Sequence, residues 1–165
     1  MNDECNRLKE DCSKDLSIIK STISDNPFSS NNRFLIDFMI IRACSTIEKI
    51  FKLIIHNFLA DSVKPETERF LSKRIIDSSC NPSAGIMENI LADIDSIKKE
   101  QFCDWLRENN QRNIKGDLNS LVTLRNNLAH CNENTSGASI NIVERYFNSG
   151  IEVLDFLDDI LSEKA

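Results

Sequence analysis

The segment from about residue 32 to residue 60 contains neither glycine nor proline, and its apolar side chains recur every three or four positions. This spacing places them on one face of an α-helix. The whole chain of 165 residues has only four glycines and three prolines, too few for the many turns of an all-β fold. We therefore expect an all-α protein, and the length fits a single domain over residues 1–165.

Three further segments show the same helical periodicity, at about residues 3–24, 118–130 and 139–161. The first of them must stop before Pro27, because proline disfavours helix in the residue before it. The polar residues 132–137 are expected to form a turn before the last helix. Together with residues 32–60, these segments predict an antiparallel bundle of four main helices.

The middle of the chain, between residues 62 and 115, is less regular and predicts short helices. One should begin at Pro65, which suits a first helical turn, and end at the loop 78–82. A second periodic stretch covers residues 84–97, and a short apolar cluster around Phe102 indicates a helical turn. Asn113 and the four residues before it have the composition of a loop.

Composition excludes several classes of protein. With 41% hydrophobic and 28% charged residues the chain is globular. Its net charge of −6 argues against a broad nucleic-acid footprint, although a local RNA site remains open. The longest apolar runs are too short to span a bilayer, so we expect a cytoplasmic protein.

No metal or other cofactor is expected. The only histidines are His56 and His130, and their spacing to the cysteines does not fit a zinc site. No two cysteines form a C-x-x-C pair, which indicates reduced cytosolic thiols. The six cysteines are at positions 5, 12, 44, 80, 103 and 131.

Arg125 is out of place on the helix predicted at 118–130. It falls at the centre of an apolar face, where an unpaired charge would be very costly. It must therefore have a partner, or that face must border a cleft or an interface. Glu48, at the edge of the apolar stripe of the 32–60 helix, is the best candidate partner. The structural alternative is a simple ion pair within the bundle. The apolar face consists of Leu118, Leu121, Val122, Leu128 and Ala129.

The flank of the same helix is polar but almost uncharged, whereas solvated faces usually carry more Lys and Glu. Amides beside an imidazole suit hydrogen bonding to a ligand or a partner chain. Arg125 and His130 are five residues apart, so they point about 140° apart on a regular helix. Two copies of the helix around a two-fold axis would bring both pairs into one cleft. The flank comprises Asn119, Thr123, Asn126, Asn127 and His130.

The segment Leu124-Arg125-Asn126-Asn127-Leu128-Ala129-His130 resembles the signature of the HEPN superfamily, and Arg42 to Glu48 resembles an earlier helix of its RiboL-PSP-like branch. Many relatives have glycine directly after the histidine, where this chain has Cys131. The resemblance implies an all-α bundle that dimerises with its two motifs facing each other. It also implies metal-independent endoribonuclease activity, as in toxin–antitoxin, anti-phage and CRISPR systems.

Metal-free RNA cleavage requires proton transfer from the 2′-hydroxyl and positive charge on the phosphate. We expect His130 to transfer the proton and Arg125 to hold the scissile phosphate, leaving a 2′,3′-cyclic phosphate. Asn126 would hydrogen-bond the histidine or the phosphate. Glu48 and Asn127 would support the site. The expected partners are RNA, a second copy of the chain, and an antitoxin or another defence protein.

Two surface features have a functional and a structural interpretation. Arg42, Lys49 and Lys52 share one face of the 32–60 helix and would guide RNA, although charged stripes usually just face water. Trp105 could stack on a base, although core packing is the commoner role of a tryptophan.

Two other functions remain open. The bundle could be a non-catalytic binding or adaptor subunit of a defence complex, with Arg125 in an interface ion pair. A nucleotide-binding or nucleotide-modifying protein would need a glycine-rich loop or a carboxylate–histidine cluster, and neither pattern is present in the sequence.

Overall fold

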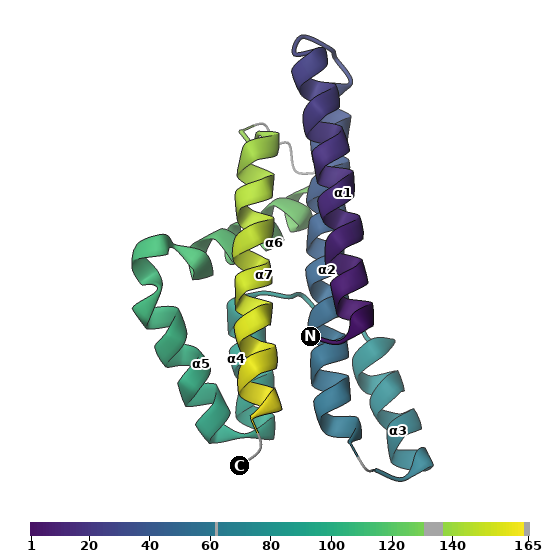
Figure 1. Cartoon of the computed structure of the whole chain (residues 1–165), viewed down its shortest axis with the longest axis vertical. Coiled ribbons are helices and arrows are strands. Elements are labelled where there is room, and N and C mark those ends of the chain that lie inside the picture. Colours follow the sequence, from purple (N-terminus) through teal and green to yellow (C-terminus); the bar gives the residue numbers. More distant parts are fainter. Residues whose placement is uncertain (62, 131–136, 164–165) are drawn as a thin grey trace.

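The computed structural model describes residues 1–61, 63–130 and 137–163, and within them the chain forms helices joined by loops, with no strand (Figure 1). The expected all-α class is confirmed. The elements are α1 (Asp3–Asp25), α2 (Asn32–Ala60), α3 (Pro65–Leu71), the π-helix η1 (Ser72–Ile76), α4 (Ala84–Ile94), α5 (Ser96–Glu108), the 3-10 turn η2 (Asn110–Arg112), α6 (Ile114–Ala129) and α7 (Ile140–Ser162). None of the described helices is long and apolar enough to cross a membrane.

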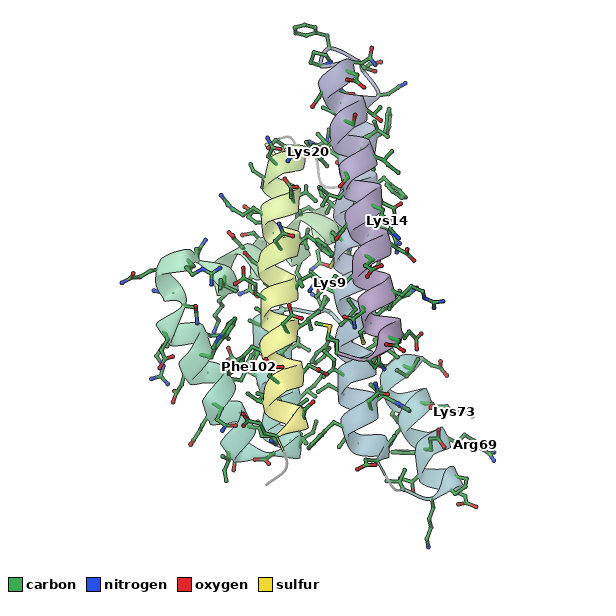
Figure 2. The ribbon with its side chains drawn as sticks, viewed as in Figure 1. Lys9, Lys14, Lys20, Arg69, Lys73 and Phe102 are labelled. Atoms are coloured by element: carbon green, nitrogen blue, oxygen red, sulfur yellow. The ribbon has the colours of Figure 1, made fainter. Side chains whose placement is uncertain are left out.

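Helices α1 and α2 form a long hairpin that extends past the start of α7 (Figure 1). Ion pairs tie the hairpin together and to α7: Arg42 of α2 binds Asp15 of α1 at 2.9 Å, and Lys9 of α1 binds Asp155 of α7 at 3.2 Å. Lys20 of α1 lies near the other end of α7 (Figure 2), where it contacts Glu144. The inner stripe of α1 is buried and consists of Cys5, Cys12, Leu16 and Ile19.

The core lies between α2, α6 and α7, with α6 passing obliquely behind α7 (Figure 1). At Gly150, α7 comes so close to α2 that an added Cβ would lie 2.4 Å from Cδ1 of Ile47. The largest fully buried side chains include Phe51, Phe147 and Leu118, one from each of these three helices. The four main helices predicted from the sequence are present, as α1, α2, α6 and α7, with bounds within about four residues of the predicted ones.

The middle of the chain differs from the prediction at Asp95. The stretch predicted at 84–97 is wrong as one helix, because Asp95 ends α4 and its carboxylate accepts hydrogen bonds from the Ile97 and Lys98 amides to begin α5. An aspartate that caps the following helix outweighs continued periodicity. The apolar cluster around Phe102 lies within a helix of 13 residues and not in a single turn.

Trp105 is half-buried and packs against the core. Its ring stacks on Phe156 of α7, with the ring centroids 4.6 Å apart. This contact confirms the core-packing interpretation and leaves the ring face against Phe156 closed to a nucleic-acid base.

Helix α6 begins at Ile114, four residues before the predicted start, so Asp117 does not cap it. The residue before the helix, Asn113, has a left-handed backbone with φ of 55°, a conformation that asparagine tolerates well. Asp117 is buried instead: its carboxylate binds Nε of Arg145 at 3.1 Å and accepts a hydrogen bond from Ser149 at 3.2 Å. Both partners lie on α7, so this cluster fixes the start of α6 against α7.

Candidate functional site

Arg125 of α6 lies against α2. Its Nη2 atom is 3.7 Å from Oε2 of Glu48, so the pairing expected from the sequence is present. The arginine side chain is 27% exposed and that of Glu48 is 18% exposed. The guanidinium is therefore neither sealed in the core nor free in solvent. It keeps an open side on which a phosphate could approach.

Glu48 connects Arg125 to a wider polar network. Its Oε1 atom lies 2.6 Å from Nζ of Lys52 and accepts a hydrogen bond from the Cys80 amide at 3.1 Å. Lys52 also donates to the carbonyl oxygens of Ile76 and Ser78. Because both carboxylate oxygens of Glu48 are engaged, its charge is held in place beside the guanidinium of Arg125.

The thiol of Cys44 also contacts Arg125. Burial raises the pKa of the Cys44 thiol above its ordinary value of 9.0, and a hydrogen bond with Arg125 acts in the opposite direction. Cys44 is fully buried. The guanidinium therefore lies at the boundary between the core and the surface, with a neutral thiol on one side and a carboxylate on the other.

The second half of α6 emerges from the core. Leu118, Leu121 and Val122 are buried as predicted, but Leu128 is only half-buried and Ala129 is exposed. The expected apolar face is therefore covered only along the first half of α6. Arg125 accordingly lies where the covered part ends.

His130 is the C-cap of α6. It is exposed, and its backbone amide donates to the carbonyl oxygen of Asn126 at 3.0 Å. No contact joins the imidazole to Arg125 within the described part of the chain. Arg125 faces α2 while His130 stands at the helix end, in keeping with the 140° separation expected for this spacing.

The polar flank of α6 divides into structural and open positions. The side chain of Asn119 accepts a hydrogen bond from the Ala84 amide at the start of α4, which is a structural role. Asn127 lines a cleft of about 360 Å³ between α6 and the start of α7, together with Thr123 and Tyr146. Asn126 is half-buried beside Arg125 in the sequence. Amide side chains therefore remain available near the exposed end of α6.

The predicted basic face of α2 is not one solvated stripe. Arg42 is paired with Asp15, and Lys52 is only 9% exposed and held by Glu48. Lys49 is exposed. Lys52 is buried because η1 packs against it, and the sequence of α2 alone does not indicate that contact. The role of Arg42, Lys49 and Lys52 in guiding RNA stays a prediction.

A cleft of about 490 Å³ lies beside this network, and sequence reasoning missed part of its lining. We call it the α1–α2 cleft. Arg7 of α1 belongs to it, although nothing in the sequence around Arg7 marks it as functional, since only the packing of α1 on α2 brings it there. The cleft is lined by Glu4 and Arg7 of α1, by Glu48, Lys49 and Lys52 of α2, and by Ile76 of η1.

No group of three or more His, Cys, Asp or Glu side chains is placed to hold a metal ion within residues 1–61, 63–130 and 137–163. Cys131, the departure from the family pattern, and most of the turn predicted at 132–137 lie outside the described residues.

Comparison with known proteins identifies the family of the chain. A search of curated proteins and a search of solved structures each gave no match. The family model described as RiboL-PSP-HEPN matches residues 8–163, which include the long hairpin, Glu48, Arg125 and His130. HEPN domains are in general associated with ribonuclease or nucleotide-related functions. Because the match covers nearly the whole chain, the protein belongs to the RiboL-PSP-HEPN family.

Proposed function

We propose that this protein is a metal-independent endoribonuclease whose active site is shared by two copies of the chain. The observation that carries the proposal is the position of Arg125, oriented by Glu48 at 3.7 Å yet partly open, on the same helix as the exposed His130. A guanidinium in fixed geometry suits a phosphate. An exposed imidazole suits proton transfer near neutral pH.

The proposed reaction divides the work between these groups. Attack of the 2′-oxygen on the phosphorus requires removal of the 2′-hydroxyl proton and donation of a proton to the leaving 5′-oxygen. The imidazoles of His130 from the two chains would serve as base and acid. Arg125 would stabilise the charge that gathers on the phosphate, and Asn126 would hydrogen-bond the phosphate or the histidine. The products are a 2′,3′-cyclic phosphate and a free 5′-hydroxyl.

A second copy is needed because Arg125 and His130 of one chain diverge. An apolar stripe on the exposed part of α2 supports such pairing, since solitary domains rarely expose neighbouring aromatic side chains. The side chain of Phe34 is 73% exposed, that of Phe38 53% and that of Ile41 48%. The stripe continues along α2 toward Glu48, and a two-fold axis near it would place both motifs in one cleft.

The direct test is cleavage of total RNA and of tRNA by the purified protein in the presence of EDTA, beside His130→Ala. Cleavage by the native protein, 2′,3′-cyclic phosphate ends, and loss of activity in a variant of unchanged molar mass are the expected results. Full activity of His130→Ala would sink the proposed chemistry.

Mixing the native protein with His130→Ala tests the shared site. A mixed dimer has one His130, whereas the proposed reaction needs one imidazole as base and a second as acid. An excess of the variant should therefore suppress cleavage by the native protein, and cleavage that stays proportional to the amount of native chain would contradict a site shared by two chains. Phe38→Asp should yield monomers by light scattering and lose cleavage, and an active monomer would contradict the shared site.

The adaptor function is the second candidate, favoured by the same ion pair. If Arg125 serves only to hold α6 on α2, Arg125→Ala would weaken folding or assembly, and the native dimer would cleave no RNA. A role as toxin or anti-phage effector, with an antitoxin or defence protein as partner, extends either function and is tested by co-purification with the products of neighbouring genes.

A further inference from the structure

The α1–α2 cleft lies directly beside the candidate active site, because Glu48 belongs to both. One carboxylate oxygen of Glu48 contacts Arg125, and the other contacts Lys52 inside the cleft. An RNA strand whose scissile phosphate lies on Arg125 must continue past the site in both directions. The cleft, about 490 Å³ and walled by α1, α2 and η1, is a concave surface at that position.

The charges in the cleft are not balanced internally. Lys52 and Glu48 neutralise each other at 2.6 Å. Arg7 and Lys49 are exposed and have no ion-pair partner in the described part of the chain, and the exposed Glu4 at the rim is likewise unpaired. Two free cations therefore face one free carboxylate. In a protein of net charge −6 such a local positive site is where an anion would be held.

We propose that the α1–α2 cleft binds the phosphate backbone of a single RNA strand next to the cleavage site, with Arg7 and Lys49 as the phosphate contacts. The proposal rests on the proposed ribonuclease function and adds the path that the substrate takes. Arg7 supplies a planar pair of donors, and Lys49 a mobile ammonium. Lys52 does not contact phosphate in this scheme, because Glu48 and two backbone carbonyls already occupy its donors.

The experiment measures binding of a fluorescently labelled single-stranded RNA to the His130→Ala protein, so that the RNA stays intact. The test variant adds Arg7→Gln and Lys49→Gln. The control adds Arg69→Gln and Lys73→Gln, which remove two exposed cations of α3 and η1 that do not line the cleft and whose side chains point outward from these helices (Figure 2). Both variants change the net charge equally, so only the position of the charges differs.

Each phosphate contact on a single strand contributes about 0.7 to the slope of log affinity against log salt. Loss of two contacts should therefore lower that slope by about 1.4, so that a fourfold rise in salt costs the parent about sevenfold more affinity than the test variant. The control should keep the slope of the parent. Glu4→Gln should tighten binding, because it removes the opposing carboxylate.

A test variant with the affinity and slope of the control would overturn the proposal. Absence of RNA binding by the parent would overturn it as well. The ribonuclease proposal is judged separately, by RNA cleavage with His130 intact. If the native protein cleaves RNA but the Arg7→Gln and Lys49→Gln changes leave RNA affinity unaltered, the cleft proposal is rejected and the active-site proposal is not.

Discussion

The two halves of α6 differ in burial. In the first half, Ile114, Leu118, Leu121 and Val122 are buried and Asp117 is bound by Arg145 and Ser149. In the second half no residue from Thr123 to His130 is buried, and the family motif lies there. The two halves form one continuous helix. The difference shows that a motif can be held in place by packing about one to two turns away along the helix, while its own side chains stay accessible.

This difference in burial explains why Arg125 can be charged and still lie at the end of an apolar face. The helix that carries it is held in place by the packing of Leu118 and Leu121, and not by burial of Arg125 itself. Substitutions in the first half should therefore act on stability, and substitutions in the second half on activity.

The largest effect is expected from His130→Ala. Removal of a general acid–base group costs about 10²–10⁴-fold in rate, and we expect that loss in RNA cleavage. Because the side chain is exposed, the free energy of unfolding should change by less than about 0.5 kcal/mol. Rate assays and urea denaturation of the same preparation check both. A variant that loses stability along with activity would break the separation.

Leu118→Ala should destabilise the protein by about 3 kcal/mol, because it deletes a fully buried side chain and leaves a cavity between α6 and α7. The matched control is Leu124→Ala in the second half, where the side chain is half-buried and the expected loss is about 1 kcal/mol. Chemical denaturation measures both. Equal losses at the two positions would show that the halves are packed alike.

Asp117→Asn should cost about 1–2 kcal/mol, because a buried carboxylate with three hydrogen-bonding partners becomes neutral. Arg145 is more than half exposed, which limits the loss, since water can solvate it. The control is Arg112→Gln, which breaks an exposed pair with Glu152 and should change stability by less than about 0.5 kcal/mol. A matching small effect for Asp117→Asn would mean that the cluster does not anchor α6.

The smallest effect concerns Cys44, the buried neighbour of Arg125. Burial raises its pKa in the folded protein above 9.0, so the thiol keeps its proton when the unfolded chain has begun to lose it. The contribution to stability is complete below pH 9.0 and declines as the pH rises above that value. Urea denaturation between pH 8 and pH 10 should show a shallower decline in Cys44→Ala. An identical decline would assign the alkaline loss to other groups, such as Cys5, whose pKa burial raises to about 11.

Much of this protein follows from its sequence alone. The apolar periodicity of α1, α2 and α7 is a local property, because side chains three and four positions apart share a helix face whatever surrounds them. The position of Arg125 on an apolar face and its need for a carboxylate also follow locally, and Glu48 at the edge of the apolar stripe of α2 is the expected partner. The structure places the two side chains together.

Other features depended on which helices meet. The break at Asp95 required a carboxylate to cap a new helix rather than continue the old one. Lys52 is buried because η1 covers it, and Arg7 reaches the cleft because α1 lies on α2. Ala129 is exposed although it continues the apolar face of α6. Periodicity specifies a face, but the tertiary contacts decide what covers that face. Burial and charge pairing across helices are therefore settled by the assembled fold.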